Sequence, residues 1–289
     1  MCGSSIAKES LASPGRNGLT VRRRWATLVG PEGFVMCLDC NCGQPGAPPG
    51  PGHTPSAGHN TSAEHNTGTG QRRVALEARL LGRNDTAAAA NRSTFRSAGV
   101  RVVNLLSSPG SGKTALLERL GRDRAPDRSM AVVVGDLATD NDAVRLRAAD
   151  IEAVQITTGQ ACHLESEMVS RAIAGLHLDG LDLLVIENVG NLVCPAAYDL
   201  GEDLRVVMLS VSEGEDKPLK YPATFHTADL VVISKLDLAG ACGFDRRLAL
   251  ANIARVAPRA RVMAVSARSG EGMENLAAAL GIGGAVAVG

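Results

Sequence analysis

A phosphate-binding loop pattern constrains the fold of this chain more than any other feature of its sequence. Residues 107–114 read SSPGSGKT and lie between an apolar run and a predicted helix. The usual pattern begins with Gly where this chain has Ser107, but its Gly-Lys-Thr end is intact. Glycines turn backbone N–H groups toward an anion, the lysine reaches the β- and γ-phosphates, and the threonine holds Mg²⁺. Unless the segment is a plain strand-to-helix turn, it binds a nucleotide through Gly110, Ser111, Gly112, Lys113 and Thr114.

Short apolar runs alternate with amphipathic stretches over most of the chain. Strands are predicted at 100–106, 130–134, 153–156, 181–186, 204–211, 230–233 and 261–265. Helices are predicted at 72–98, 115–121, 143–149, 164–176, 245–256 and 273–280. Strands that alternate with helices favour a mostly parallel sheet with helices on both faces. The sequence therefore predicts an α/β fold of the P-loop NTPase type over residues 71–289, with ligands at the C-terminal strand ends.

The first 70 residues differ in composition from the rest. Residues 1–35 are irregular and basic, residues 36–42 read MCLDCNC, and residues 43–70 consist mainly of Gly, Pro, His, Thr and Ser. A segment with so few apolar side chains cannot offset its conformational entropy by burial, so 43–70 is expected to be disordered. Its histidines recur every six residues, at His53, His59 and His65. This spacing indicates either a flexible linker or a weak tract that collects nickel or zinc.

The composition excludes several classes of protein. The 30 Lys and Arg balance the 30 Asp and Glu, and aromatic residues make up 2% of the chain. A dedicated nucleic-acid binder would carry a basic excess, and often aromatic residues that stack on bases. Neither an 18-residue apolar run nor a secretory signal is visible, so neither a membrane span nor export is expected. Seven cysteines are too few for a disulfide scaffold, and the cluster of three at 37, 40 and 42 indicates metal or redox chemistry in a reducing compartment, which for this chain is expected to be the cytoplasm.

Two later loops match the base-reading segments of GTPases. Residues 234–237 read SKLD, with Ser234 in place of the usual Asn. Asp237 is suited to accept two N–H bonds from the edge of guanine, and adenine presents no such pair of donors. Residues 265–268 read VSAR and match the last guanine-contacting loop. The predicted base site consists of Lys235, Asp237, Ser266 and Ala267.

Acidic residues end two of the predicted strands. Glu187 is followed three residues later by Gly190, whose N–H is suited to sense the γ-phosphate. Glu187 is longer than the usual Asp, so its contact with Mg²⁺ is expected to run through water. After Asp136, the polar residues Asn141 and Asp142 either position Mg²⁺ or the attacking water, or cap a helix. The predicted catalytic residues are Lys113, Thr114, Asp136 and Glu187.

A first candidate metal site combines two loops at the nucleotide end of the sheet. Cys162 and His163 precede a predicted helix, and Cys194 follows Gly190 by four residues. Cysteine and histidine suit Zn²⁺ or Ni²⁺, although either cysteine taken singly is compatible with a small buried hydrophobic residue. Three ligands leave a tetrahedral site incomplete, so a water or a second copy of the chain is expected to complete it.

A second candidate metal site lies in the N-terminal segment. Three thiolates within six residues can close around one ion without a fold, with an affinity that falls as the pH falls. A redox Cys-x-x-Cys pair is the alternative, but it needs a helix N-terminus to lower a thiol pKa, and none is visible here. The ligands of this site are Cys37, Cys40 and Cys42. Four residues show no partner pattern and are expected to be structural: Cys2, His177, His226 and Cys242.

Five segments together resemble one known family. They are 104–114 (NLLSSPGSGKT), 158–165 (TGQACHLE), 187–195 (ENVGNLVCP), 213–222 (EGEDKPLKYP) and 234–238 (SKLDL). They resemble the hydrogenase nickel-incorporation GTPases, the HypB family of nickel–iron hydrogenase maturation factors. The resemblance covers residues 36–273, and ENVGNLVCP and EGEDKPLKYP are its most specific parts.

The resemblance implies an activity, a metal site and partners. It implies a GTPase that binds GTP and Mg²⁺, dimerises when nucleotide binds, and carries nickel with an accessory protein to the precursor of a hydrogenase large subunit. The family residues that match Cys162, His163 and Cys194 form a nickel or zinc site at the dimer interface. Some members begin with Met-Cys-x-x-Cys-Gly-Cys, which 36–42 matches with Asn41 in place of Gly. Met36 is therefore expected to be the natural start.

The same loop carries the γ-phosphate sensor and Cys194, so metal affinity and dimer geometry are expected to depend on the nucleotide. Hydrolysis is expected to be slow, because no residue clearly orients water and no arginine finger is identifiable. Three alternatives remain open. The first is a urease accessory GTPase, whose Cys-Pro-His motif differs from the Cys-Pro-Ala at 194–196. The others are a nickel storage or sensing protein with a regulatory nucleotide site, and an ATP-driven metallocluster carrier.

Overall fold

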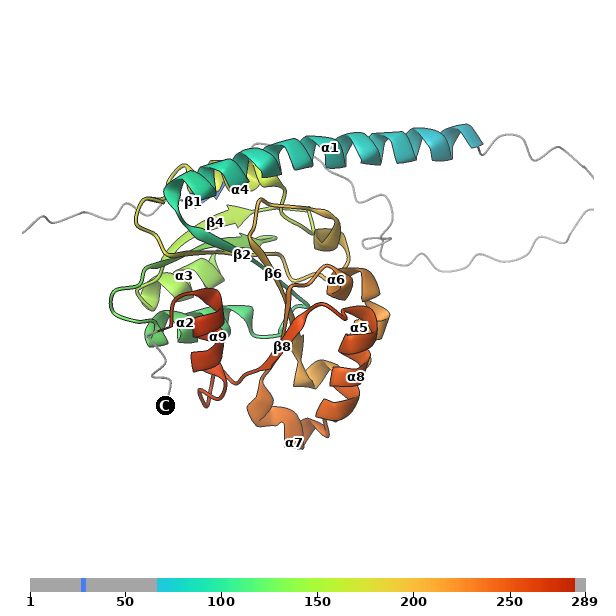
Figure 1. The fold of residues 1–289 in the computed structure, drawn as a ribbon. Coiled ribbons are helices and arrows are strands. Elements are labelled where there is room, and N and C mark those ends of the chain that lie inside the picture. The colour runs from blue at the N-terminus through green and yellow to red at the C-terminus, as the bar shows by residue number, and fades with distance from the viewer. Residues whose placement is uncertain (1–26, 30–66, 284–289) are drawn as a thin grey trace, which may run out of the picture.

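The computed structural model describes residues 27–29 and 67–283, with side chains from residue 78 on. The described strands form one parallel sheet in the order β1-β4-β3-β5-β2-β6-β7-β8 (Figure 1). Their bounds are β1 Thr27–Val29, β2 Arg101–Ser107, β3 Met130–Asp136, β4 Glu152–Thr157, β5 Leu183–Glu187, β6 Leu204–Ser210, β7 Leu230–Ser234 and β8 Arg261–Ala264. The prediction of an α/β fold with a parallel sheet is confirmed.

Helices cover both faces of this sheet. Their bounds are α1 Thr67–Ala98, α2 Lys113–Asp123, α3 Asn141–Ala148, α4 Ser166–Ile173, α5 Lys217–Lys220, α6 Pro222–His226, α7 Ala239–Cys242, α8 Arg246–Val256 and α9 Met273–Leu280. Short 3₁₀ turns follow three of the strands: η1 Cys194–Ala197, η2 Val211–Glu213 and η3 Leu236–Leu238. None of the helices between residues 67 and 283 combines the length and apolar character needed to span a bilayer.

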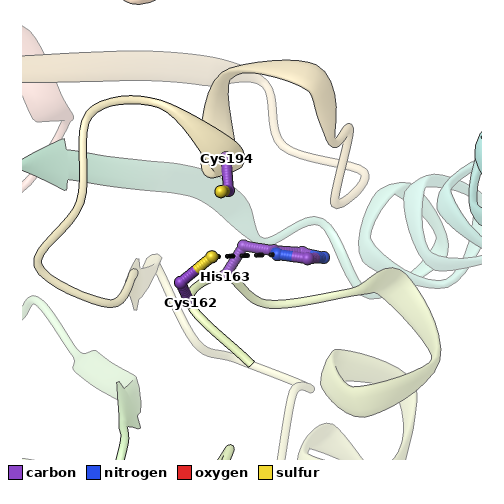
Figure 2. A group of neighbouring side chains, drawn as sticks. All are labelled: Cys162, His163 and Cys194. Carbon is purple, nitrogen blue, oxygen red and sulfur yellow. Dashed lines mark hydrogen bonds between the residues drawn. The ribbon is translucent and has the colours of Figure 1, made fainter. Parts of the chain in front are cut away.

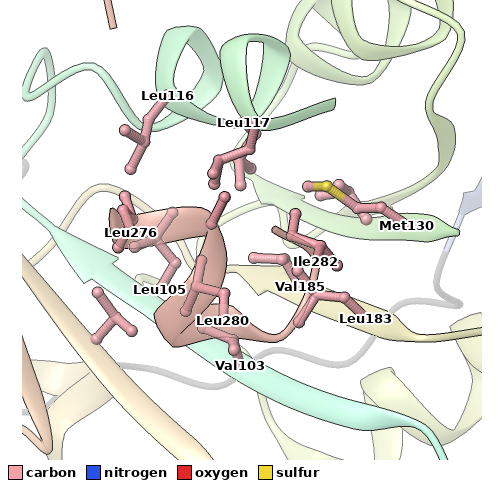
Figure 3. Packing of buried hydrophobic residues seen from close by; sticks show 14 of the residues in the cluster. Val103, Leu105, Leu116, Leu117, Met130, Leu183, Val185, Leu276, Leu280 and Ile282 are labelled. Carbon is pink, nitrogen blue, oxygen red and sulfur yellow. The ribbon is translucent and has the colours of Figure 1, made fainter. Parts of the chain in front are cut away.

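The side chains of β2 alternate between the two faces of the sheet and show which helices cover each face. Val103 and Leu105 pack in one cluster with apolar residues of α2, α3 and α9 (Figure 3). Val102 lies in a second cluster with residues of α1 and α4, and Leu106 in a third with residues of α6 and α8. Successive side chains of a strand point to opposite faces, so a strand that is apolar throughout must be covered on both sides.

Most predicted elements match the structure within a few residues at their ends. The strands predicted between 100 and 265 correspond to β2–β8, and the helix predicted at 273–280 is α9. Two expectations differ from the structure. Residues 1–35 were expected to be irregular but include β1, which pairs with β4. Helix α1 begins at Thr67 rather than at 72, inside the expected linker 43–70. Extending a packed helix costs little once its first turn exists, even through residues of poor helix propensity.

Three short helices were not predicted. Helices α5 and α6 each have a proline in the first turn, and α7 is only four residues long. Proline is compatible with a helix start because the first N–H groups have no intrahelical partner. Such short segments carry too few residues to show a helical period in the sequence.

Helix α1 is fixed to the body of the protein by buried asparagines. Asn84 Nδ2 donates to the carbonyl of Asp199 at 2.7 Å, and its Oδ1 accepts the N–H of Ser166 at 2.9 Å. Asn91 Nδ2 donates to the carbonyl of Ser166 at 2.9 Å. Arg92 adds a bidentate contact with the Asp199 carboxylate at 2.7 and 2.8 Å. These contacts fix the start of α4 and the segment before β6, which flank the candidate metal ligands.

All strands of a parallel sheet end at the same edge, so the loops after β2, β3, β4, β5, β7 and β8 meet there. These loops and the adjoining ends of strands and helices contain every candidate site residue within the described part of the chain. Cys37, Cys40, Cys42, the spaced histidines, Cys2 and the expected start at Met36 lie outside the described residues, as do residues 43–66 of the segment expected to be disordered.

Candidate nucleotide and metal site

The phosphate-binding loop connects β2 to α2. Gly110 and Gly112 have φ angles of 73° and 95°, a region that favours glycine over other residues. Lys113 Nζ donates to Ser107 Oγ at 3.0 Å, and Ser111 Oγ donates to the same oxygen at 2.5 Å. Ser107, which replaces the usual glycine, thus accepts hydrogen bonds from both the lysine and Ser111 of this loop. Burial lowers the pKa of the Lys113 ammonium, and the nearby Glu187 carboxylate opposes this effect.

Glu187 lies beside the phosphate-binding loop at the end of β5 and is 2% exposed. Thr114 Oγ1 donates to Glu187 Oε1 at 3.1 Å, while Oε2 is buried and has no hydrogen-bond partner among the described residues. Burial raises the pKa of Glu187 to about 7, and the positive charge of Lys113 opposes the rise. A threonine hydroxyl beside a carboxylate with one unsatisfied oxygen is a hard oxygen donor set. These residues therefore fit Mg²⁺.

Asp136 has a different environment. Its Oδ1 accepts the N–H of Ala138 at 3.0 Å and that of Thr139 at 2.9 Å, so the carboxylate stabilises the turn after β3. The capping alternative for Asn141 and Asp142 is wrong. Helix α3 begins at Asn141 after Asp140, which makes no side-chain cap, and Asp142 pairs with Arg145 at 3.5 Å.

The loops after β7 and β8 form the candidate base site. The buried Ser266 hydroxyl donates to Asp237 Oδ1 at 2.5 Å and so orients the carboxylate. Lys235 has a φ of 58°, and its Nζ donates to the carbonyl of Gly110 at 2.6 Å. Ser234 Oγ donates to the carbonyl of Ser111 at 2.8 Å, so both residues tie this loop to the phosphate-binding loop. The carbonyl of Ala267 accepts from an arginine of α2 at 3.3 Å.

Cys162, His163 and Cys194 come together at the same edge of the sheet. One ligand atom from each lies within 4.8 Å of the other two. Cys162 Sγ is 3.9 Å from His163 Nδ1, and Figure 2 shows Cys194 approaching them from the neighbouring segment. Both cysteines are half-buried, which disagrees with their alternative role as buried hydrophobic residues. Two sulfurs and one imidazole form a borderline-soft ligand set suited to nickel or zinc.

Two further residues contact the histidine, and the sequence did not reveal their role. The ring of His163 stacks on that of Tyr198 at a centroid distance of 3.9 Å. His163 Nε2 lies 3.7 Å from Glu165 Oε1, and this neighbour lowers the pKa of Glu165. A carboxylate often supports a metal-binding histidine, but at this distance Nε2 has no hydrogen-bond partner among the described residues. Glu165 lies two residues after His163, so a sequence signal existed, whereas Tyr198 offered none.

The residues expected to be structural lie away from this site. His226 Nδ1 is 3.2 Å from the carbonyl of Val256, while His177 and Cys242 are exposed. Within the described part of the chain, the cluster of Cys162, His163 and Cys194 is the group of His, Cys, Asp and Glu residues that could hold a metal ion.

Comparison with known proteins agrees with this geometry. The family model for the nucleotide-binding domain of CobW, HypB and UreG matches residues 101–264. The hydrogenase maturation factor HypB of Azotobacter chroococcum is 54% identical over 208 residues, which span 70% of this chain and 66% of that protein. The hydrogenase maturation factor HypB of Escherichia coli is 47% identical over 211 residues, 72% of either chain.

Two solved structures are similar to this chain in both fold and sequence. The crystal structure of HypB from Helicobacter pylori in complex with nickel has a TM-score of 0.66 and 42% identity, and the match covers 68% of this chain and 93% of that one. HypB from Archaeoglobus fulgidus has a TM-score of 0.64 and 39% identity, with 69% and 97% covered. The chain therefore belongs to the HypB family of hydrogenase maturation factors, within the CobW/HypB/UreG group of nucleotide-binding domains.

Proposed function

We propose that this protein is a GTPase that binds nickel and delivers it during the maturation of a nickel–iron hydrogenase. The observation that carries the proposal is the position of the ligand set. Cys162, His163 and Cys194 lie within 4.8 Å of one another at the edge of the sheet that also holds the phosphate-binding loop. Nickel is the cargo of this reaction, and zinc is the competing ion for the same ligands.

The nucleotide is held by residues from four loops. Lys113 neutralises the β- and γ-phosphates, and the backbone of Gly110, Ser111 and Gly112 surrounds them. Thr114 and Glu187 hold Mg²⁺, which when bound offsets the negative charge of the phosphates. The Asp237 carboxylate, oriented by Ser266, accepts the two N–H groups of guanine. Lys235 crosses the phosphate-binding loop, and Ala267 lies beside the base.

Hydrolysis is slow in this proposal. Asp136 accepts two backbone N–H groups at Oδ1, and we expect its carboxylate to position Mg²⁺ or the attacking water rather than to act as a general base. Arg145, an arginine of α3, is held by the Glu118 carboxylate at 3.1 and 2.9 Å. A GTPase without a general base or a released arginine turns over slowly.

Nucleotide state controls the metal site through the loop after β5. Gly190 is so close to Pro109 that an added Cβ would lie 3.1 Å from its Cα. A γ-phosphate bound at the loop therefore displaces Gly190, and this displacement changes the geometry of the nearby metal ligands. The same displacement favours a dimer, in which a second copy completes the three-ligand site.

The remaining parts of the proposal concern partners and location. The protein accepts nickel from an accessory protein and transfers it to the precursor of a hydrogenase large subunit, as its family membership suggests. Cys37, Cys40 and Cys42 form a second nickel site, and the protein acts in the cytoplasm, where thiols stay reduced. Cell fractionation and pull-down with the hydrogenase precursor test these points.

The decisive test compares nickel affinity with GDP and with a non-hydrolysable GTP analogue. We expect the two affinities to differ by about fivefold or more, together with a change in dimer fraction. Lys113→Ala should abolish the difference, and Cys194→Ala should abolish nickel binding at the site and hydrogenase rescue in cells. Cys242→Ala, an exposed thiol on α7, is the matched control and should behave as the parent. Equal affinities and equal dimer fractions in the parent would refute the proposal.

A further inference from the structure

Two asparagines connect the nucleotide-sensing loop to the loop that carries Cys162 and His163. These loops follow different strands, β5 and β4, and β3 lies between those strands in the sheet. The chain that connects the two loops includes all of α4 and β5. A displacement of one loop therefore reaches the other only through side chains. The two asparagines, Asn188 and Asn191, flank Gly190.

Asn188 is fully buried at the end of β5. Its Oδ1 accepts the N–H of Leu164 at 3.3 Å and the N–H of Val189 at 2.9 Å. Its Nδ2 donates to Asn104 Oδ1 at 3.3 Å, which ties the same side chain to the strand before the phosphate-binding loop. Leu164 follows His163 directly, so this amide fixes the backbone on one side of the metal ligands.

Asn191 fixes the other side. Its Nδ2 donates to the carbonyl of Cys162 at 3.3 Å, and its Oδ1 accepts the N–H of Val193 at 2.9 Å. The pair Cys162 and His163 is thus held at both ends by the loop that contains Gly190.

The backbone route from Gly190 to Cys194 is interrupted. Leu192 lies between them, is 4% exposed, and belongs to the apolar cluster around α6 and α8. Its carbonyl accepts a hydrogen bond from Thr224 of α6. A displacement of Gly190 is therefore stopped at a packed residue before it reaches Cys194, whereas no such anchor separates it from Asn191.

We propose that Asn191 is a positioning residue that transmits the nucleotide state from Gly190 to Cys162 and His163, while the buried Asn188 holds the backbone on the other side of these ligands. The inference rests on the proposed function and specifies its route: the Asn191 amide moves the ligand loop, while Cys194 stays comparatively fixed. Both positions need an amide, because each side chain donates one hydrogen bond, while Asn191 accepts one and Asn188 accepts two. A carboxylate of the same size accepts but cannot donate.

Asn191→Asp is the sharpest test of this route. The substitution keeps the size of the side chain and the oxygen that accepts the Val193 N–H, but it replaces the donor to the Cys162 carbonyl with a second acceptor. Asn252→Asp is the matched control, since Asn252 Nδ2 donates to the carbonyl of Glu215 at 2.8 Å and thus joins α8 to the segment before α5 without contacting a metal ligand. Asn191→Ala is the second variant, without an added charge.

The measurement is a titration with nickel ions alone, followed by thiolate-to-nickel absorption, in the presence of GDP or a non-hydrolysable GTP analogue. In the parent and in Asn252→Asp, the two dissociation constants should differ by about fivefold or more. In Asn191→Asp and Asn191→Ala the ratio should fall to within about twofold of one, while the affinity for the GTP analogue stays as in the parent.

Each outcome decides whether the nucleotide state reaches the metal ligands through the asparagine side chains or through the backbone. A ratio of one in the parent refutes the proposed function, and this inference with it. A parental ratio in both Asn191 variants refutes the inference alone and assigns the coupling to the backbone through Leu192. A uniform loss of nickel affinity with an unchanged ratio also refutes it, because a purely structural role weakens the site equally in both nucleotide states.

Discussion

The buried carboxylate of Glu187 leads to a quantitative prediction about stability. Glu187 is 2% exposed, and burial raises its pKa from an ordinary value of 4.5 to about 7. A pKa that differs by one between the native and unfolded states corresponds to about 1.4 kcal/mol, so ionising this group in the native state costs about 3 kcal/mol. Glu187→Gln replaces it with a neutral side chain of the same shape and removes that cost.

The sign follows from proton linkage. Between pH 4.5 and 7 the native state keeps the Glu187 proton while the unfolded state loses it, so the stability of the parent falls as the pH rises. Above pH 7 both states are ionised and the loss is complete. The stability of Glu187→Gln relative to the parent should therefore increase by about 3 kcal/mol between pH 4.5 and pH 8.

The assay is urea unfolding followed by circular dichroism at several pH values, with EDTA and without nucleotide. Glu274→Gln removes an exposed carboxylate of α9 and controls for the change in net charge. With Mg²⁺ and GDP added, the parent should gain stability that Glu187→Gln does not, because the variant lacks the anionic oxygen for the ion. A relative stability that does not change with pH, or that changes in favour of the parent as the pH rises, would contradict the reasoning.

Three other substitutions test separate parts of the structure. Asp237→Asn should weaken GTP binding on the order of 100-fold and favour xanthosine triphosphate, whose C2 oxygen matches an amide donor; competition titration measures both. Gly190→Ala adds a Cβ 3.1 Å from the backbone of Pro109, so GTP hydrolysis should fall about tenfold or more while GDP binding is retained, as single-turnover kinetics would show. Leu117→Ala should lower the free energy of unfolding by about 2–5 kcal/mol in urea titrations at constant m-value, because Leu117 is 1% exposed in the α2 cluster.

Much of the fold was visible in the sequence because its signals are local. Apolar strands of five to seven residues, such as β5 and β2, and amphipathic helices, such as α9, are fixed by short-range patterns of burial. The short helices α5, α6 and α7 and the strand β1 escaped prediction because too few residues carried their pattern.

The candidate site also contains parts that local sequence predicted and parts that depend on the tertiary structure. Gly110, Lys113 and Thr114 form one loop, so their chemistry could be derived from spacing alone. The contact between Thr114 and Glu187, 73 residues apart, requires β2 and β5 to be neighbours. Asp136 shows what the sequence could not predict. Its position at the end of a strand was predicted, but not that its carboxylate accepts two N–H groups of the turn after β3.

The sequence by itself determined the phosphate-binding loop pattern, the alternation of strands and helices, and the residues proposed as soft metal ligands. Only the tertiary structure decided that Cys194 lies beside Cys162 and His163, that Glu165 lies next to the histidine, and that asparagines join the two loops. The physical reason is the order of the sheet. Which strands pair is settled by burying apolar surface across residues far apart in the chain, and no local pattern encodes that choice.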